Sequence, residues 1–394
     1  MLNKNKYILT TLFLGTIISR LFSIYFFGDS NLDNEWGIIL LNWEKEGVFG
    51  YRIIEGQIVP NIFMPPLYAL FLALINYFIN DIEILPNVVL YIQLILSTIS
   101  VFIIYRILTQ LFSKRVVFLS SFVFSFFPLN VYSVSQISSI TLQVFLLSIF
   151  FYFIISFDRS KKNKYLIGFS ASSSLLILLR AEFILFFIFS LVFIYSSKKN
   201  LKNLFIASLI TLVLISPYMI RNYIIFDKIV ITQSFGYNLW KGNNENLKVD
   251  GYYLQLNPEL NKKINEIGYD IKYDLLVDKV YEKEAIKFIK NNPSEIIKLY
   301  FKKIFAFLFV DLNSSYPQYY NFAHLMPKIL ITLTTFFGIY FGIRNRIFNY
   351  FSSYYFLNLF LLSTFFILPR YSLAILPCQI ILSAVFFERI LRRF

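Results

Sequence analysis

Residues 87–112 read NVVLYIQLILSTISVFIIYRILTQLF, and Arg106 is the only charged side chain in this run. A helix that crosses a bilayer needs about 20 predominantly apolar residues, so the run predicts a membrane-spanning helix. The whole chain of 394 residues is 57% hydrophobic and only 15% charged. Soluble domains carry about 25% charged residues. We therefore expect an integral membrane protein.

Nine further apolar runs have comparable length and are bounded by charged or loop residues. These are 7–27, 116–134, 139–157, 164–180, 183–197, 201–219, 326–343, 348–368 and 372–388. Together with the first run they predict an all-α fold with about ten transmembrane helices. Two shorter apolar stretches, 66–80 and 299–312, are not long enough for their length to show whether they cross the membrane.

Clusters of basic residues between these runs predict the orientation. Their members are Lys4, Lys6, Lys114, Arg115, Arg159, Lys161, Lys162, Lys164, Lys198, Lys199, Lys202, Arg344, Arg346, Arg389, Arg392 and Arg393. The positive-inside rule places the clusters and both termini in the cytoplasm. The chain must then cross an even number of times between clusters. The stretch 66–80 therefore lies along the outer surface or enters the membrane and returns, and 299–312 is interfacial. The clusters account for essentially the whole net charge of +14, so the charge does not indicate nucleic-acid binding.

This topology divides the chain into three parts. Residues 1–225 form an N-terminal transmembrane catalytic module that includes a first outer loop, 28–86. Residues 226–298 form an extracytoplasmic loop region. Lys and acidic residues are nearly balanced in this region, and we expect an amphipathic helix near 274–291. Residues 299–394 comprise an interfacial helix and the C-terminal transmembrane helices.

The single cysteine and the single histidine limit the possible chemistry. Cys378 excludes an intrachain disulfide and a cysteine cluster for metal, and His324 excludes a histidine-based metal site or relay. Any chemistry must therefore rest on carboxylates, Arg, Lys, Tyr and the backbone.

A few charged residues near the outer helix ends are not explained by the orientation of the chain in the membrane. An ionisable group at bilayer depth costs about 2.5–3.5 kcal/mol and needs a partner or a wet cavity. Guanidinium groups can bind phosphate bidentately, and a carboxylate beside them can act as a general base. One outer cavity would satisfy Arg20, Asp33, Glu35, Arg180, Arg221, Lys303 and Arg370 together. The pattern favours group transfer from a lipid phosphate at the outer leaflet.

Each of these charges also has a structural alternative. Arg20 would extend its side chain to the interface. Arg180 would pair with Glu182 across a tight turn, and Asp33 or Glu35 would cap the following helix. Interfacial anchoring or the start of a helix is the corresponding alternative for Lys302, Lys303 and Arg370. Their shared membrane face favours a common site.

The segments around these residues resemble, in order, motifs of the GT-C superfamily of glycosyltransferases that use polyprenyl-phosphate sugars. This group contains the protein O-mannosyltransferases and the aminoarabinose transferase of lipid A. The matching segments are Asp33-Asn34-Glu35-Trp36, 64–68 ("PPLY"), 179–182 ("RPE", with Ala181 replacing Pro), 216–223 ("PWxxRNY"), 236–244 ("GxNLWxGNN") and Arg370-Tyr371 with Pro377. The resemblance covers most of the chain.

The resemblance implies an inverting transfer from a polyprenyl-phosphate sugar at the extracytoplasmic face, with no metal or other cofactor. The acidic first-loop motif would supply the base. Asp33 is the better match and Glu35 is the alternative, because Asn34 separates two acids that are adjacent in well-known members. The donor phosphate would be held by Arg20, Arg180, Arg221, Lys303 and Arg370. Substrate contacts would come from Tyr68, Glu182, Asn238, Trp240 and Tyr371.

The expected partners are a lipid-linked sugar donor, membrane lipids and an acceptor, which is left open among protein, lipid A, cell-wall polymer and glycolipid. A transporter or flippase of lipid-linked sugars is the main alternative. Transporters favour ionisable groups near the midplane and paired discontinuous helices. Here the unusual charges lie near one face, and the two halves show no symmetry. A non-catalytic scaffold of the cell envelope would leave those charges unexplained.

Overall fold

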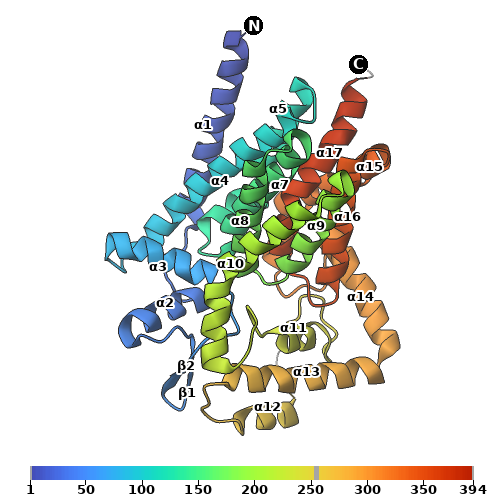
Figure 1. Ribbon diagram of the computed structural model, residues 1–394. Helices are drawn as coiled ribbons and strands as arrows, with labels where there is room; N and C mark the ends of the chain where they lie inside the picture. The colour runs from blue at the N-terminus through green and yellow to red at the C-terminus, as the bar shows by residue number, and fades with distance from the viewer. Residues whose placement is uncertain (1, 253–256, 393–394) are drawn as a thin grey trace.

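The computed structural model describes residues 2–252 and 257–392, which form seventeen α-helices and one two-stranded antiparallel hairpin (Figure 1). Four members of the basic clusters fall outside this description. Arg393 is one of them, and the others are the side chains of Lys4, Lys6 and Lys198.

Every predicted apolar run coincides with a helix, the run 116–134 with the two helices α5 and α6. The helices are α1 (Leu2–Phe27), α4 (Leu85–Thr109), α5 (Lys114–Ser125), α6 (Pro128–Tyr132), α7 (Ser139–Ser160), α8 (Asn163–Leu179), α9 (Phe183–Lys198), α10 (Leu201–Phe226), α15 (Phe322–Gly342), α16 (Arg346–Ser363) and α17 (Leu376–Leu391). Among the described residues, six helices are long and apolar enough to cross a membrane, or seven if the bent α5–α6 pair is one span. The all-α membrane class is therefore confirmed, whereas the count of ten spans stays a prediction.

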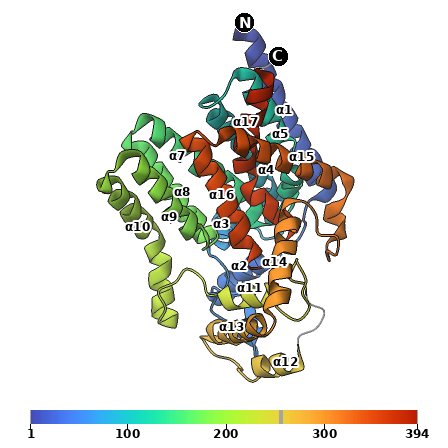
Figure 2. The same ribbon diagram turned by 90° about the vertical axis from the view of Figure 1, so that its right-hand side faces the viewer.

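The apolar helices form one bundle. Figure 2 shows α7, α8, α9 and α10 side by side on one flank, with α1 and α15 on the other. Helix α17 is largely buried and packs closely against α15, because Gly338 has no Cβ that would collide with the carbonyl of Leu382. Small residues at such crossings let membrane helices approach each other.

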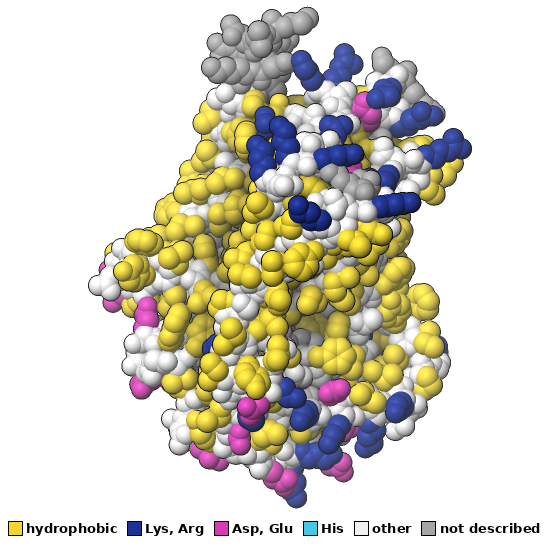
Figure 3. Space-filling view, viewed as in Figure 1, with side chains coloured by type: hydrophobic (Ala, Val, Ile, Leu, Met, Phe, Trp, Pro, Cys, Tyr) yellow, Lys and Arg dark blue, Asp and Glu magenta, His cyan; other side chains and the backbone are white. Residues whose placement is uncertain are grey.

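Charge divides the molecule along its long axis. Both termini lie at one end, where Lys and Arg side chains gather, and a broad hydrophobic band separates this end from the other (Figures 1 and 3). The opposite end carries Asp and Glu among its Lys and Arg side chains. This is the charge distribution from which the orientation was predicted.

The hydrophilic segments and the two shorter apolar stretches fold into a layer at the end opposite the termini (Figure 1). Its elements are α2 (Glu35–Glu46), β1 (Arg52–Ile54), β2 (Gln57–Val59), α3 (Leu67–Ile79), α11 (Phe235–Gly242), α12 (Pro258–Asn265), α13 (Tyr273–Asn291) and α14 (Pro293–Leu308). Helix α13 covers the amphipathic helix predicted near 274–291. The layer has a small core of its own, built around Val59, Trp240, Val277 and Tyr281.

Local sequence explains why α2, which positions the first-loop acids, begins and ends where it does. Asn34 caps its N-terminus, because the side-chain oxygen accepts a hydrogen bond from the backbone N–H of Gly37 at 3.0 Å. The helix ends at Gly47, whose φ of +70° is a left-handed conformation that suits glycine. Asp33 and Glu35 are therefore held on either side of a fixed helix start.

Candidate active site

A cavity of about 1000 Å³ lies where the polar layer meets the helical bundle. Segments far apart in the sequence meet there. Its lining comes from the stretches 28–36, 63–65, 129–140, 179–185, 232–238 and 361–373. Such a cavity is large enough for a sugar and the phosphate that carries it.

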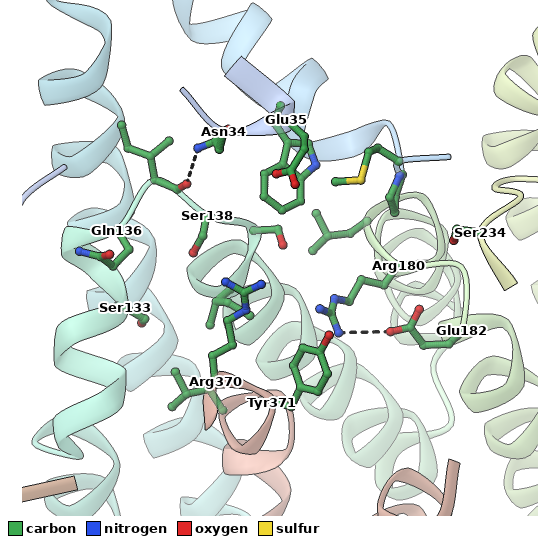
Figure 4. A pocket seen from close by; sticks show the side chains of 18 of the residues that line it. Asn34, Glu35, Ser133, Gln136, Ser138, Arg180, Glu182, Ser234, Arg370 and Tyr371 are labelled. Carbon is green, nitrogen blue, oxygen red and sulfur yellow. Dashed lines mark hydrogen bonds and ion pairs between the residues drawn. The ribbon is translucent and has the colours of Figure 1, made fainter. Parts of the chain in front are cut away.

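The first-loop acids lie at one wall of this cavity. Asp33 and Glu35 both line it and are exposed to it, and Figure 4 shows Glu35 directed toward the centre. Asn34 between them donates a hydrogen bond from Nδ2 to the carbonyl oxygen of Ile137 at 2.9 Å. This bond ties the acidic loop to the segment that enters α7.

Two arginines face Glu35 from the bundle (Figure 4). Arg180 follows α8 in extended backbone, and its Nη1 lies 3.3 Å from Oε1 of Glu182. Its guanidinium also lies over the ring of Tyr371, 5.2 Å from the centroid. Arg370 comes from the 3-10 turn Pro369–Ile375, is exposed, and forms no ion pair with any described residue. It is therefore available to an anion.

A third cation, Lys241, approaches the same region and was missed by the sequence reading. Its Nζ lies 4.6 Å from the ring centroid of Phe366, which lines the cavity. Burial lowers the pKa of Lys241, with Arg370 lowering it further and Glu35 opposing the shift. Lys241 occupies a variable position of the 236–244 motif, so the motif itself gave no signal for it.

Two glycines of that motif bring α11 against its neighbours. A Cβ at Gly236 would collide with the carbonyl of Asp278, and one at Gly242 would collide with the carbonyl of Phe365. Because glycine has no Cβ, α11 lies close enough to its neighbours to place Asn238 at the cavity wall. The two glycines therefore help to position the polar side chain of Asn238, which lies between them in the sequence.

The cavity thus brings together seven of the twelve predicted site residues. They are Asp33, Glu35, Arg180, Glu182, Asn238, Arg370 and Tyr371. The other five, which do not line the cavity, are Arg20, Tyr68, Arg221, Trp240 and Lys303.

Arg20 is buried inside the bundle and does not extend to the interface. Its Nε donates to Oγ of Ser97 at 3.2 Å, and its Nη1 donates to Oγ of Ser19 at 3.0 Å and to the carbonyl of Ser125. The guanidinium therefore joins α1 to α4 and α5. The expectation that it lines the outer cavity is not met, because the α1 face that carries it packs against these helices.

Arg221 and Lys303 are also engaged elsewhere. Nη1 of Arg221 donates to the carbonyl of Asn61 at 2.6 Å and to Oδ1 of Asn222 at 2.8 Å, which fastens the first outer loop to α10. Nζ of the buried Lys303 donates to Oδ1 of Asn243 at 3.1 Å. Both support segments near the cavity without lining it.

Tyr68 and Trp240 lie in the packed interior behind the cavity. The hydroxyl of Tyr68 donates to Oε1 of Gln93 at 3.1 Å, and its ring packs edge-to-face against Trp36, which does line the cavity. Trp240 belongs to the small core of the polar layer.

Several cavity residues were not predicted from the sequence. Asp29 accepts a hydrogen bond at Oδ2 from the backbone N–H of Ile137 at 2.7 Å. Burial raises the pKa of Asp29, that hydrogen bond opposes the rise, and the nearby charge of Asp33 adds to it. Tyr132 is the last residue of α6, and Gln136 lies in the connection between α6 and α7. The available signals were one more acid near Asp33 and Glu35 in the first outer loop, and a short polar link between two apolar runs.

Residues 64–220 match the family model of the dolichyl-phosphate-mannose-protein mannosyltransferases. This match confirms the resemblance to GT-C superfamily glycosyltransferases that the motifs indicated. It spans the segments 64–68 and 179–182, whereas Asp33 and Arg370 lie outside it. No curated protein matches the chain.

Proposed function

We propose that this membrane glycosyltransferase of the GT-C type moves a sugar from a polyprenyl-phosphate donor to an acceptor hydroxyl at the extracytoplasmic face, with inversion. The observation that supports it most directly is that Asp33, Glu35, Arg180 and Arg370 line one cavity, with Glu35 opposite the two arginines in Figure 4. Acids and phosphate-binding cations at one site are what such a transfer requires.

In this proposal the donor phosphate binds to Arg180 and Arg370, with Lys241 nearby. Arginine forks suit phosphate oxygens, and two arginines in the cavity with a third cation near its wall stabilise the charge that develops on a leaving phosphate. Arg20, Arg221 and Lys303 are left out of this role, because each hydrogen-bonds to protein groups away from the cavity.

The transfer is a single displacement. Asp33 takes the proton of the acceptor hydroxyl as its oxygen forms a bond to the anomeric carbon. The bond from that carbon to the phosphate oxygen breaks, and polyprenyl phosphate leaves with the electron pair. The transition state has oxocarbenium character, as in glycoside hydrolysis.

The two acids have different neighbours, which supports Asp33 as the base. Glu35 interacts electrostatically with Lys241, and it faces Arg370 in Figure 4. Asp33 interacts with Asp29 instead. We therefore assign Glu35 to balancing the cations and orienting the donor, and Asp33 to the acceptor proton.

The remaining parts of the proposal concern topology and cofactors. The termini and the basic end lie in the cytoplasm, ten helices cross the membrane, and the cavity opens at the outer face. The cations supply the charge that the leaving phosphate needs, so we expect transfer to continue in the presence of EDTA.

Phosphorus NMR on the protein in nanodiscs tests the function. Synthetic polyprenyl-phosphate sugars are phosphodiesters, and their transfer leaves polyprenyl phosphate, a monoester with a distinct signal. With cell-envelope extract as the acceptor source, we expect monoester to accumulate with the wild-type protein. No conversion of any polyprenyl-phosphate hexose or pentose would overturn the proposal. So would wild-type conversion by a variant carrying both Asp33→Asn and Glu35→Gln.

A further inference from the structure

One side of the cavity differs in composition from the side that holds Arg180. Its lining residues, which we call the polar arm, are Gly28, Asp29, Ser30, Asn31, Tyr132, Ser133, Gln136 and Tyr319. Figure 4 shows Gln136 and Ser133 on this side, away from Arg180 and Glu182. None of these eight residues is basic.

Two tyrosines give the polar arm an aromatic wall. The rings of Tyr132 and Tyr319 lie edge-to-face, with centroids 6.0 Å apart. Phe27 packs against the ring of Tyr132 at 5.8 Å, and His324 lies nearly parallel to the ring of Tyr319 at 6.3 Å. Both tyrosines are half-buried, so their rings are held in place while part of each borders the cavity.

Hydrogen-bond acceptors lie in the same arm. Asp29 uses Oδ2 for the N–H of Ile137, and Gln136 uses Nε2 for the carbonyl of Phe27 at 3.0 Å. These bonds fix both side chains. Oδ1 of Asp29 and Oε1 of Gln136 receive no hydrogen bond from any other described residue. Fixed acceptors without an internal donor are suited to hydroxyl groups of a ligand.

The charge of the arm selects against an anionic ligand. Asp29 and Asp33 are close enough to influence each other electrostatically. Asp29 in the arm and Asp33 near it repel a phosphorylated acceptor, and the arm has no basic residue to offset them. Neutral hydroxyl groups are accepted, because they donate to carboxylate and amide oxygens.

We propose that the polar arm binds a neutral carbohydrate, one hydroxyl of which is the acceptor in the transfer; this rests on the proposed function. The C–H face of the sugar packs against Tyr132 and Tyr319, since the face of an aromatic ring is electron-rich. Its other hydroxyls donate to Asp29 and Gln136. The attacking hydroxyl lies at Asp33, between the arm and the cations, and its proton passes to that carboxylate.

Saturation-transfer NMR on the protein in nanodiscs tests this. The probes are mannobiose, maltose, mannose 6-phosphate and a threonine-containing tripeptide with blocked ends. We expect one or both disaccharides to bind, and the phosphosugar and tripeptide to bind at least about tenfold more weakly. Tyr319→Ala should weaken disaccharide binding about tenfold. Tyr316→Ala is the matched control, because it lies in the same segment but does not line the cavity.

Asp29→Asn gives a second variant that keeps the fold. Its side-chain oxygen still accepts the hydrogen bond from Ile137, but the charge is lost. We expect weaker disaccharide binding, with phosphosugar binding increased relative to it. Preferred binding of the tripeptide or the phosphosugar to the wild-type protein would overturn the inference, as would an unchanged affinity in both variants.

A separate measurement distinguishes this failure from failure of the proposed function. Binding of polyprenyl phosphate, followed by its phosphorus signal, depends on Arg180 and Arg370 and not on the polar arm. If polyprenyl phosphate binds but neither disaccharide does, the acceptor assignment is wrong and the transferase proposal stands. If polyprenyl phosphate does not bind, the transferase proposal itself fails.

Discussion

The side chain of Asn34 joins the acidic loop to a segment more than a hundred residues away, through a 2.9 Å hydrogen bond from Nδ2 to the carbonyl oxygen of Ile137. The same side chain caps α2 through Gly37. In well-known GT-C members the two acids of this motif are adjacent, whereas here Asn34 separates Asp33 from Glu35. In this chain it fixes the position of Asp33 and Glu35 relative to the cavity.

Replacing Asn34 separates its two roles. Asn34→Asp keeps an oxygen for the cap but cannot donate to Ile137, whereas Asn34→Ala loses both bonds. The alanine variant should lose about 1 kcal/mol from the start of α2. We expect both variants to transfer sugar more slowly with unchanged affinity for polyprenyl phosphate. Equal rates for wild type and Asn34→Asp would show that the bond to Ile137 has no part in activity.

The assignment of the base leads to a second prediction. Asp33→Asn removes the proton acceptor and should lower the transfer rate about 10²- to 10⁴-fold, with donor affinity retained. Glu35→Gln should alter donor affinity as well, because Glu35 interacts with Lys241. Phosphorus NMR of donor conversion and binding measures both. The reverse pattern would identify Glu35 as the base.

Arg370 should determine the affinity for the donor phosphate. Losing a hydrogen bond to a charged group costs about 1.5–3 kcal/mol, so Arg370→Ala should weaken polyprenyl-phosphate binding about 10- to 100-fold. Lys302→Ala is the control, because Lys302 is exposed and does not line the cavity. A similar loss in both variants would mean that net charge, and not the site, attracts the phosphate.

Arg20 should affect stability and not donor binding. Arg20→Met removes hydrogen bonds that join α1 to α4 and α5. Hydrogen bonds between membrane helices contribute about 0.6 kcal/mol each, so we expect a loss of about 1–2 kcal/mol. Thermal unfolding followed by tryptophan fluorescence measures it. Unchanged stability together with weakened polyprenyl-phosphate binding would return Arg20 to the donor site.

Asp274 predicts a pH dependence of stability. Burial raises its pKa to about 6, although Nε of Arg52 lies 3.0 Å from Oδ1. Asp278 also raises it, and the tyrosines at positions 51 and 273 are its other titratable neighbours. The folded protein binds the proton more tightly than the unfolded chain, so this contribution is present below about pH 4 and is lost as pH rises to about 6.

The isosteric variant Asp274→Asn tests that dependence. The melting temperature of the wild type should fall more steeply than that of the variant between about pH 4 and 6, because only the wild type must ionise a buried carboxylic acid. Parallel curves would show that Arg52 fully compensates the burial of Asp274.

The helices were predictable because hydrophobic length is a local property. A run such as 87–112 must form its backbone hydrogen bonds internally in a membrane, and α4 follows directly from it. The charge difference between the two ends was also predictable, because the position of a basic cluster between two apolar runs is likewise a local property of the sequence. The hairpin of β1 and β2 was not predicted, since its strands are only three residues each.

The cavity was only partly predictable. Arg180 and Arg370 were expected at one face, and the structure places both at the cavity. Arg20 and Lys241 show the limit. Both are basic, yet Arg20, which was expected at the cavity, is enclosed by helices, and Lys241, which was not, reaches toward the site.

The sequence by itself determined that the chain is a helical membrane protein with its sparse acids and arginines near one face. Only the tertiary structure decided which of those charges share a cavity. Hydrophobicity specifies that a helix enters the bilayer, but it does not specify the helix's rotation about its own axis. Packing against neighbouring helices sets that rotation, which directs Arg20 toward Ser97 and Ser125. Arg370 instead faces Glu35 from the turn Pro369–Ile375.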